Sequence, residues 1–135
     1  MNLKRMVVAS VMVFIAFQVM DFFVHGKLLV PVYKTLTHLW RPDMMAKMWI
    51  YQISSFIMSI LFVYIFTKGY ENKGILEGAR FGLITGLFMN VVGVFGGYAM
   101  YPIPFSLALM WFAFGMAQFI ICGVIAALVY RPKVK

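Results

Sequence analysis

The chain has 135 residues, of which 64% are hydrophobic and only 12% are charged, and its mean hydropathy is +0.91. This balance excludes a water-soluble domain, and several apolar runs are long enough to cross a hydrocarbon core of roughly 30 Å. The runs are unbroken, whereas strands of a membrane barrel alternate in polarity over about ten residues, so the sequence predicts an all-α integral membrane protein.

The formal net charge is +8, from twelve lysines and arginines against four acids. The basic residues flank apolar segments instead of gathering on a soluble face, so we expect no nucleic-acid partner. The single cysteine, Cys122, lies within an apolar run. An intrachain disulfide and a cysteine-based metal site are therefore excluded.

The first apolar run, residues 6–25, predicts a membrane helix that is retained, because no small-residue cleavage site follows it. Residues 31–41 predict a short amphipathic helix in the headgroup region, which Pro31 can begin and Pro42 ends. Its apolar side consists of Val32, Tyr33, Leu36, Leu39 and Trp40, and its polar side of Lys34, Thr37, His38 and Arg41.

Three further membrane helices are expected at residues 48–67, 79–100 and 105–129. Pro102 and Pro104 force a tight return between the last two, which predicts an antiparallel hairpin. The whole chain is then a single four-helix transmembrane domain, with the interfacial helix between its first and second spans.

Small residues repeat along the third predicted span at steps of three and four. They are Gly82, Gly86, Asn90, Gly93 and Gly97, and this spacing places them on one helical face. Small residues let two helix backbones approach closely, which is a main route to helix association in lipid. We therefore expect this face to pack against another helix. At the start of the same span, Glu77 and Arg80 are expected to pair across one helical turn.

Four spans place both termini on one side of the membrane. That side would carry eight basic residues, namely Lys4, Arg5, Lys68, Lys73, Arg80, Arg131, Lys133 and Lys135. The opposite side would carry four, namely Lys27, Lys34, Arg41 and Lys47. The positive-inside rule then predicts cytoplasmic termini in a bacterial-type inner membrane.

Asp21 and His25 stand four residues apart near the outer end of the first span, with Gln18 one turn earlier on the same face. An ionisable residue within a span is a functional candidate by default. Two interpretations stay open: a structural pair with His25 or a bond to Gln52, or a role in proton transfer, ligand binding or metal binding.

Polar residues of other spans extend this candidate site. The amides Gln18, Asn90 and Gln118 fall near the midplanes of their spans, so we expect hydrogen bonds between helices there. The predicted intramembrane polar cluster consists of Gln18, Asp21, His25, Gln52, Asn90 and Gln118.

His25, His38 and Asp21 offer ligands for an outward-facing metal site, to which Met44, Met45 and Met48 could add thioethers. Their spacing matches no metal-binding signature. His25 could also supply an axial ligand to a haem or a chlorophyll within a larger assembly, although a haem held by this chain alone is not expected. The sequence identifies no particular cofactor.

No nucleophile beside a base, phosphate-binding loop or pair of carboxylates is visible, so we expect no enzymatic activity from this chain alone. The leading hypothesis is an accessory or scaffolding subunit of a larger inner-membrane complex of the energy-transducing kind, stabilising neighbouring subunits that carry cofactors. Its partners would be lipid and other membrane subunits. The alternative is a small homo-oligomeric channel or transporter, moving protons, a metal ion or a small apolar solute past Asp21 and His25.

Overall fold

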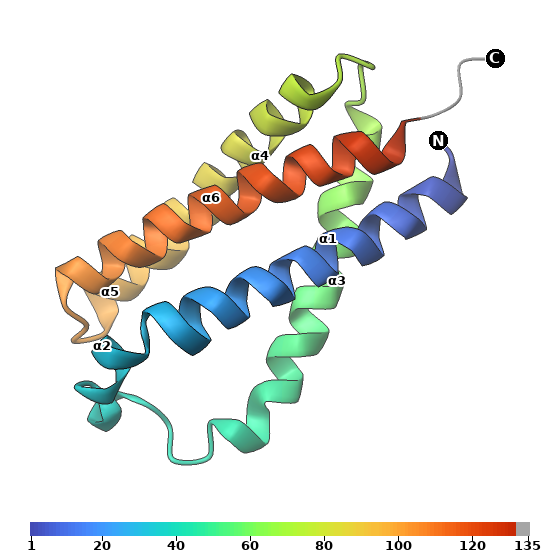
Figure 1. Ribbon diagram of the computed structural model, residues 1–135. Helices are drawn as coiled ribbons and strands as arrows, with labels where there is room; N and C mark the ends of the chain where they lie inside the picture. The colour runs from blue at the N-terminus through green and yellow to red at the C-terminus, as the bar shows by residue number, and fades with distance from the viewer. Residues whose placement is uncertain (132–135) are drawn as a thin grey trace.

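The computed structural model describes residues 1–131, which form helices joined by short turns, with no strand in that range (Figure 1). Four helical stretches within it are long and apolar enough to cross a membrane. They are Leu3–Leu28, Met45–Lys68, Ile75–Met100 and Phe105–Tyr130. The expected all-helical fold with four candidate spans is therefore confirmed.

Two of the four stretches contain a π-helical turn. In chain order the elements of the spans are α1 (Leu3–Phe23), the π-turn η1 (Val24–Leu28), the 3-10 turn η3 (Met45–Lys47), α3 (Met48–Lys68), α4 (Ile75–Asn90), the π-turn η4 (Val91–Phe95), α5 (Gly96–Met100) and α6 (Phe105–Tyr130). A π-turn holds one residue more than an α-turn. The residues that follow it are therefore displaced by about 100° from the positions that an uninterrupted α-helix would give them.

The helices pack in pairs around α6 and α1. α4 lies antiparallel along α6, and α1 packs against both α6 and α3 (Figure 1). α3 and α4 do not pack along their lengths, but the ring of Phe81 on α4 lies 4.8 Å from the ring of Phe62 on α3. The main core is formed by Ala9, Val13, Phe17, Phe62, Val63, Phe66, Phe119, Cys122, Ala126, Ala127 and Tyr130.

Glycines permit the close contact between α4 and α6. A Cβ atom on Gly82 would lie 2.7 Å from the Cα of Ile120, and a Cβ on Gly86 would lie 3.0 Å from the Cβ of Phe119. Real Cβ atoms rarely come so near, so these backbones can approach only because the side chains are missing. Gly123 serves the same purpose on α6, where a Cβ would lie 2.9 Å from the backbone nitrogen of Gly82.

Gly93 and Gly97 do not continue this glycine face. At both positions no atom lies within 4 Å of the place where a Cβ would be. Gly93 lies within the π-turn η4 and Gly97 follows it, so the extra residue of the turn rotates both away from the row of Gly82 and Gly86. The sequence placed all four glycines on one face, whereas in the structure Gly82 and Gly86 pack on α6, and at Gly93 and Gly97 an added Cβ would meet no atom within 4 Å.

The segment between α1 and α3 is not the single helix expected over residues 31–41. The helix α2 (Val30–Lys34) is short, Leu36 leaves the helical region at φ −117° and ψ 20°, and the 3-10 turn η2 (Thr37–Leu39) follows. The bend lets Leu29 and Leu36 both become buried against Leu107 at the start of α6. The expected apolar residues do face inward, because Val32, Tyr33, Leu39 and Trp40 pack on the same cluster.

Glu77 organises the loop between α3 and α4. Its carboxylate accepts hydrogen bonds from the backbone N–H groups of Glu71 (2.6 Å) and Lys73 (2.7 Å), and its side chain is only 5% exposed. Positive φ angles at Asn72 and Gly74 turn the chain so that these amides face it. The expected partner of Glu77, Arg80, instead lies 3.5 Å from Glu71.

Candidate intramembrane polar site

Asp21, in the last turn of α1, receives hydrogen bonds from two other spans. The amide of Gln118 on α6 donates to Oδ1 at 2.7 Å, and the hydroxyl of Tyr51 on α3 donates to Oδ2. Both donors are neutral, and within residues 1–131 no lysine or arginine forms an ion pair with Asp21. Since a carboxylate offers about four lone-pair sites, Asp21 keeps capacity for a further donor.

Gln18, one turn earlier on α1, bonds to α3 through a different residue. Its Nε2 donates to the hydroxyl of Ser55 at 3.2 Å, and Ser55 is buried. Gln52, the expected partner of this face, is exposed on the outside of α3, so that expectation is wrong. Tyr51 and Ser55 are four residues apart and share a helical face, from which Gln52 is rotated by about 100°.

His25 belongs to a second polar group, next to Asp21 but bonded to other residues. Its Nδ1 lies 2.5 Å from the hydroxyl of Tyr33, and the indole N–H of Trp111 donates to that same hydroxyl at 2.8 Å. Because an indole can only donate, the Tyr33 oxygen accepts this bond, while the direction of its bond with His25 depends on the tautomer of the imidazole ring. Burial raises the pKa of Tyr33 despite the opposing effect of the Trp111 bond.

The three amides expected near the midplane are not bonded to one another. Gln18 and Gln118 bond to Ser55 and Asp21, and the amide of Asn90 donates to the backbone oxygen of Gly86 at 2.8 Å. The Asn90 side chain fits because Gly115 stands opposite, where a Cβ would lie 2.9 Å from the Asn90 Cγ. Asn90 therefore packs where α4 meets α6, apart from the Asp21 site.

Asp21, His25 and His38 are not brought together as a metal-binding set. His38 is exposed on η2, and residues 1–131 contain no group of three or more histidine, cysteine, aspartate or glutamate side chains that could hold a metal ion. The Nδ1 atom of His25 is engaged by Tyr33. Only its Nε2 atom is left to act as the axial ligand to a haem or a chlorophyll that the sequence suggested.

A cavity of about 360 Å³ lies beside Asp21 and is open on one side. All four candidate spans line it, through Phe17, Asp21, Tyr51, Ser54, Ser55, Met58, Met89 and Phe119. α3 and α4 contribute Met58 and Met89, and these two helices do not pack along their lengths. The cavity therefore joins a carboxyl group to a mainly apolar space within the bundle.

Tyr51, Ser54, Met58 and Met89 line this cavity although the sequence did not single them out. Tyrosine near the end of a span usually lies at the membrane surface, so its position alone does not indicate a role for Tyr51 in an internal site. A signal was present in the spacing of Tyr51, Ser55 and Met58, which places the three side chains on one face of α3.

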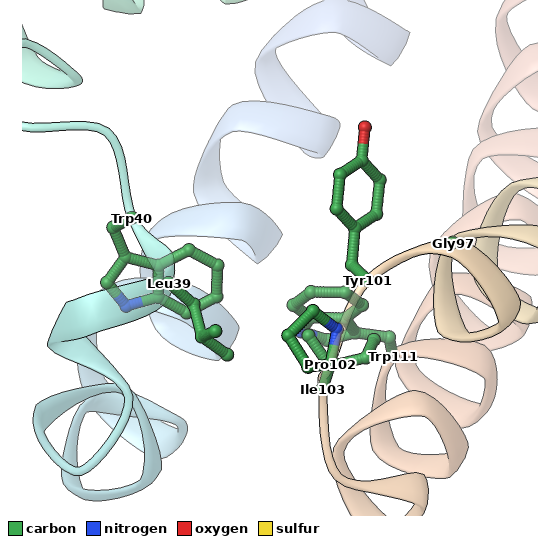
Figure 2. A pocket seen from close by; sticks show the side chains of 7 residues that line it. All are labelled: Leu39, Trp40, Gly97, Tyr101, Pro102, Ile103 and Trp111. Atoms are coloured by element: carbon green, nitrogen blue, oxygen red, sulfur yellow. The ribbon is translucent and has the colours of Figure 1, made fainter.

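A second, smaller cavity of about 220 Å³ lies where the segment after α2 meets the link between α5 and α6. Figure 2 shows Leu39 and Trp40 on one side of it and Tyr101, Pro102, Ile103 and Trp111 on the other. The indole of Trp40 donates to the backbone oxygen of Tyr33 at 3.4 Å. This cavity has no ionisable side chain other than the phenol of Tyr101, so the chemistry of the bundle is concentrated at Asp21.

Comparisons of the chain with protein-family models, with curated proteins and with solved structures found no match. The function must therefore be argued from the geometry. A carboxyl group with two neutral donors and a cavity beside it can hold a proton or accept a bond from a ligand, whereas the His25, Tyr33 and Trp111 group fastens α2 to α6.

Proposed function

We propose that the chain is an accessory or scaffolding subunit of a larger complex in a bacterial-type inner membrane, of the energy-transducing kind. The supporting observation is the third candidate span: 11% of its apolar 18-residue window is buried within the chain, against 28%, 28% and 39% for the corresponding windows of the other three. Its second half carries Gly93 and Gly96, where an added Cβ would meet no atom within 4 Å. Bare glycines on a lipid-facing helix are suited to close packing with a helix of another subunit.

The charge distribution supports cytoplasmic termini for this subunit. Of the eight basic residues assigned to the terminal side, six lie in residues 1–131, and Lys133 and Lys135 lie outside the described residues. The backbone N–H of Asn2 donates to the hydroxyl of Tyr130 at 3.2 Å. The first and fourth spans therefore share the end that is rich in lysine and arginine, as the positive-inside rule requires of cytoplasmic ends.

Association is the direct test. A tagged chain extracted in mild detergent should be recovered with stoichiometric amounts of other membrane polypeptides. Gly93→Leu should reduce that recovery severalfold, because a leucine side chain separates the helices that the glycine lets approach. Gly69→Leu is the matched control, since Gly69 also faces open space but lies in the loop after α3. A monodisperse particle that contains only this chain would contradict the proposal.

The second candidate function is passage of protons or a small solute through the membrane, in a homo-oligomer. The observation in its favour is Asp21, a carboxyl group at the meeting point of three spans beside an open cavity. In proteoliposomes, Asp21→Asn should strongly reduce flux, whereas Asp43→Asn on the exposed loop should not. Equal flux in the Asp21→Asn variant would remove this residue from any transport role.

A further inference from the structure

The few polar groups that line the mainly apolar cavity beside Asp21 point to one class of ligand. We propose that this cavity binds a small organic cation, a protonated amine with an apolar body, whose ammonium group hydrogen-bonds to the Asp21 carboxylate. This site requires neither partner subunits nor transport, and it goes beyond the scaffolding function proposed above.

The charge of Asp21 favours a cationic ligand. Asp21 is bonded only to the neutral groups of Gln118 and Tyr51, and no lysine or arginine of residues 1–131 forms an ion pair with it. A carboxylate in a low-dielectric site is stabilised strongly by a positive partner. An ammonium ion in the cavity would supply that partner and fill the lone-pair sites that remain on the carboxylate.

The direction of the hydrogen bonds around the cavity favours a ligand that donates hydrogen bonds. The hydroxyl of Tyr51 uses its hydrogen on Asp21, and the hydroxyl of Ser54 uses its hydrogen on the backbone oxygen of Ile50 at 2.8 Å. Both oxygens therefore present lone pairs, as Asp21 does. A ligand that donates hydrogen bonds suits this lining, whereas an anion or a carbonyl compound finds few donors, such as the hydroxyl of Ser55, which accepts from Gln18.

The remaining surface of the cavity suits a ligand with an apolar body. The rings of Phe17 and Phe119 form an edge-to-face pair with centroids 5.3 Å apart, and Met58 and Met89 complete the apolar lining. Aromatic faces and thioethers suit the apolar body of an amine, and aromatic rings also attract cations. A bare metal ion would need several charged or carbonyl ligands, which this lining does not supply.

The size and position of the cavity agree with this ligand class. Its volume of about 360 Å³ lies toward the lower end of the range for small-molecule sites, roughly 300–1,000 Å³. Met58 and Met89 stand on α3 and α4, which do not pack along their lengths. An amine with an apolar body can therefore reach Asp21 sideways from the lipid, between these two helices.

The test uses the full chain in lipid nanodiscs and the probe 2-phenylethylamine, which is protonated at pH 7. Calorimetric titration, corrected with empty nanodiscs, should show saturable binding of the amine. The neutral analogue 2-phenylethanol should bind at least about tenfold more weakly, because it cannot form a charge-assisted bond. Equal binding of the two probes, or no binding of the amine beyond that of empty nanodiscs, would overturn the proposal.

Three variants locate the site. Asp21→Asn should weaken amine binding by about tenfold or more, and Met89→Trp should abolish it by filling the cavity while leaving the carboxyl group in place. Asp43→Asn is the matched control, since Asp43 is an exposed acid paired with Arg41 and Lys47, and it should bind as the wild type does. If Asp21→Asn fails to fold, Met89→Trp decides, and undiminished binding in that folded variant would refute the site.

Discussion

Two carboxyl groups of this chain are satisfied by very different means. Glu77 is held by backbone amides four and six residues away in the sequence, whereas Asp21 is held by side chains 30 and 97 residues away. The bonds of Glu77 can form as soon as its own loop folds. The bonds of Asp21 form only when three spans are assembled. They therefore depend on the tertiary structure, whereas those of Glu77 depend on local structure alone.

Glu77→Gln should lower the free energy of unfolding by about 1–3 kcal/mol, because a buried amide group would then face a backbone N–H that has lost its acceptor. Reversible unfolding in mixed detergent, followed by circular dichroism, measures the change. The control is Glu71→Gln, an exposed carboxylate paired with Lys73 and Arg80, which should have the smaller effect. Equal losses in the two variants would contradict the role given to Glu77.

Single residues were only partly predictable at this scale. The importance of Asp21 followed from the cost of an acid within an apolar run. Its partners did not follow, because the choice between Tyr51 and Gln52 depends on how α3 is rotated about its axis. That rotation is set by packing of Ser55, Ser59 and other buried residues against α1, which periodicity in a nearly uniform apolar helix does not reveal.

At the scale of elements, the π-turns are the features that sequence reasoning did not foresee. η4 separates the glycines packed on α6 from those that face away, and η1 begins at Val24, beside His25. A π-turn weakens local hydrogen-bond geometry and is retained where tertiary contacts favour it. Tertiary contacts cannot be read from the pattern of apolar residues along the sequence, whereas the helices themselves can be predicted from apolar runs of about 20 residues.

The π-turn η4 predicts an unusual tolerance to deletion. Removing Val92 should convert η4 into regular α-helix and leave both flanking helices in their present orientation, with little loss of stability. Removing Ile84, which is also an exposed residue but lies within α4, should rotate Gly78 and Gly82 away from α6 by about 100°. Thermal unfolding in detergent compares the stability of the two deletion variants. An equal loss of stability in both would show that η4 does not arise from one extra residue in the helix.

At the scale of the whole molecule, the bundle is tight at one end and looser at the other. Rings of Phe62, Phe66 and Phe81 close it near the chain termini, while the cavity and the Asp21 bonds lie toward the opposite end. In that half α3 is bonded to its neighbours through Tyr51 and Ser55, and the ring of Phe56 packs on Phe14 at 5.4 Å between centroids. The two polar bonds therefore add to this apolar contact in holding the position of α3.

Tyr51→Phe should release this end of α3 and lower the free energy of unfolding by about 0.6 kcal/mol, and by no more than about 1.7 kcal/mol, the range for such bonds in membranes. Spin labels on the C-terminal end of α1 and the N-terminal end of α3 should report a broader distance distribution. Tyr64→Phe is the control, because Tyr64 is exposed and its ring contact with Lys68 survives the change. An unchanged distribution in the Tyr51→Phe variant would show that the hydroxyl does not restrain α3.

The bond between Gln118 and Asp21 also constrains the order of events during synthesis of the chain. Gln118 is made 97 residues after Asp21, so until then the carboxyl group has Tyr51 as its sole partner from another candidate span. The α4 and α6 hairpin can form from neighbouring segments, but its docking onto α1 waits for the last helix. A nascent chain halted before residue 118 would therefore leave this acid incompletely bonded, which makes the first candidate span the part of the protein most dependent on completion of the last.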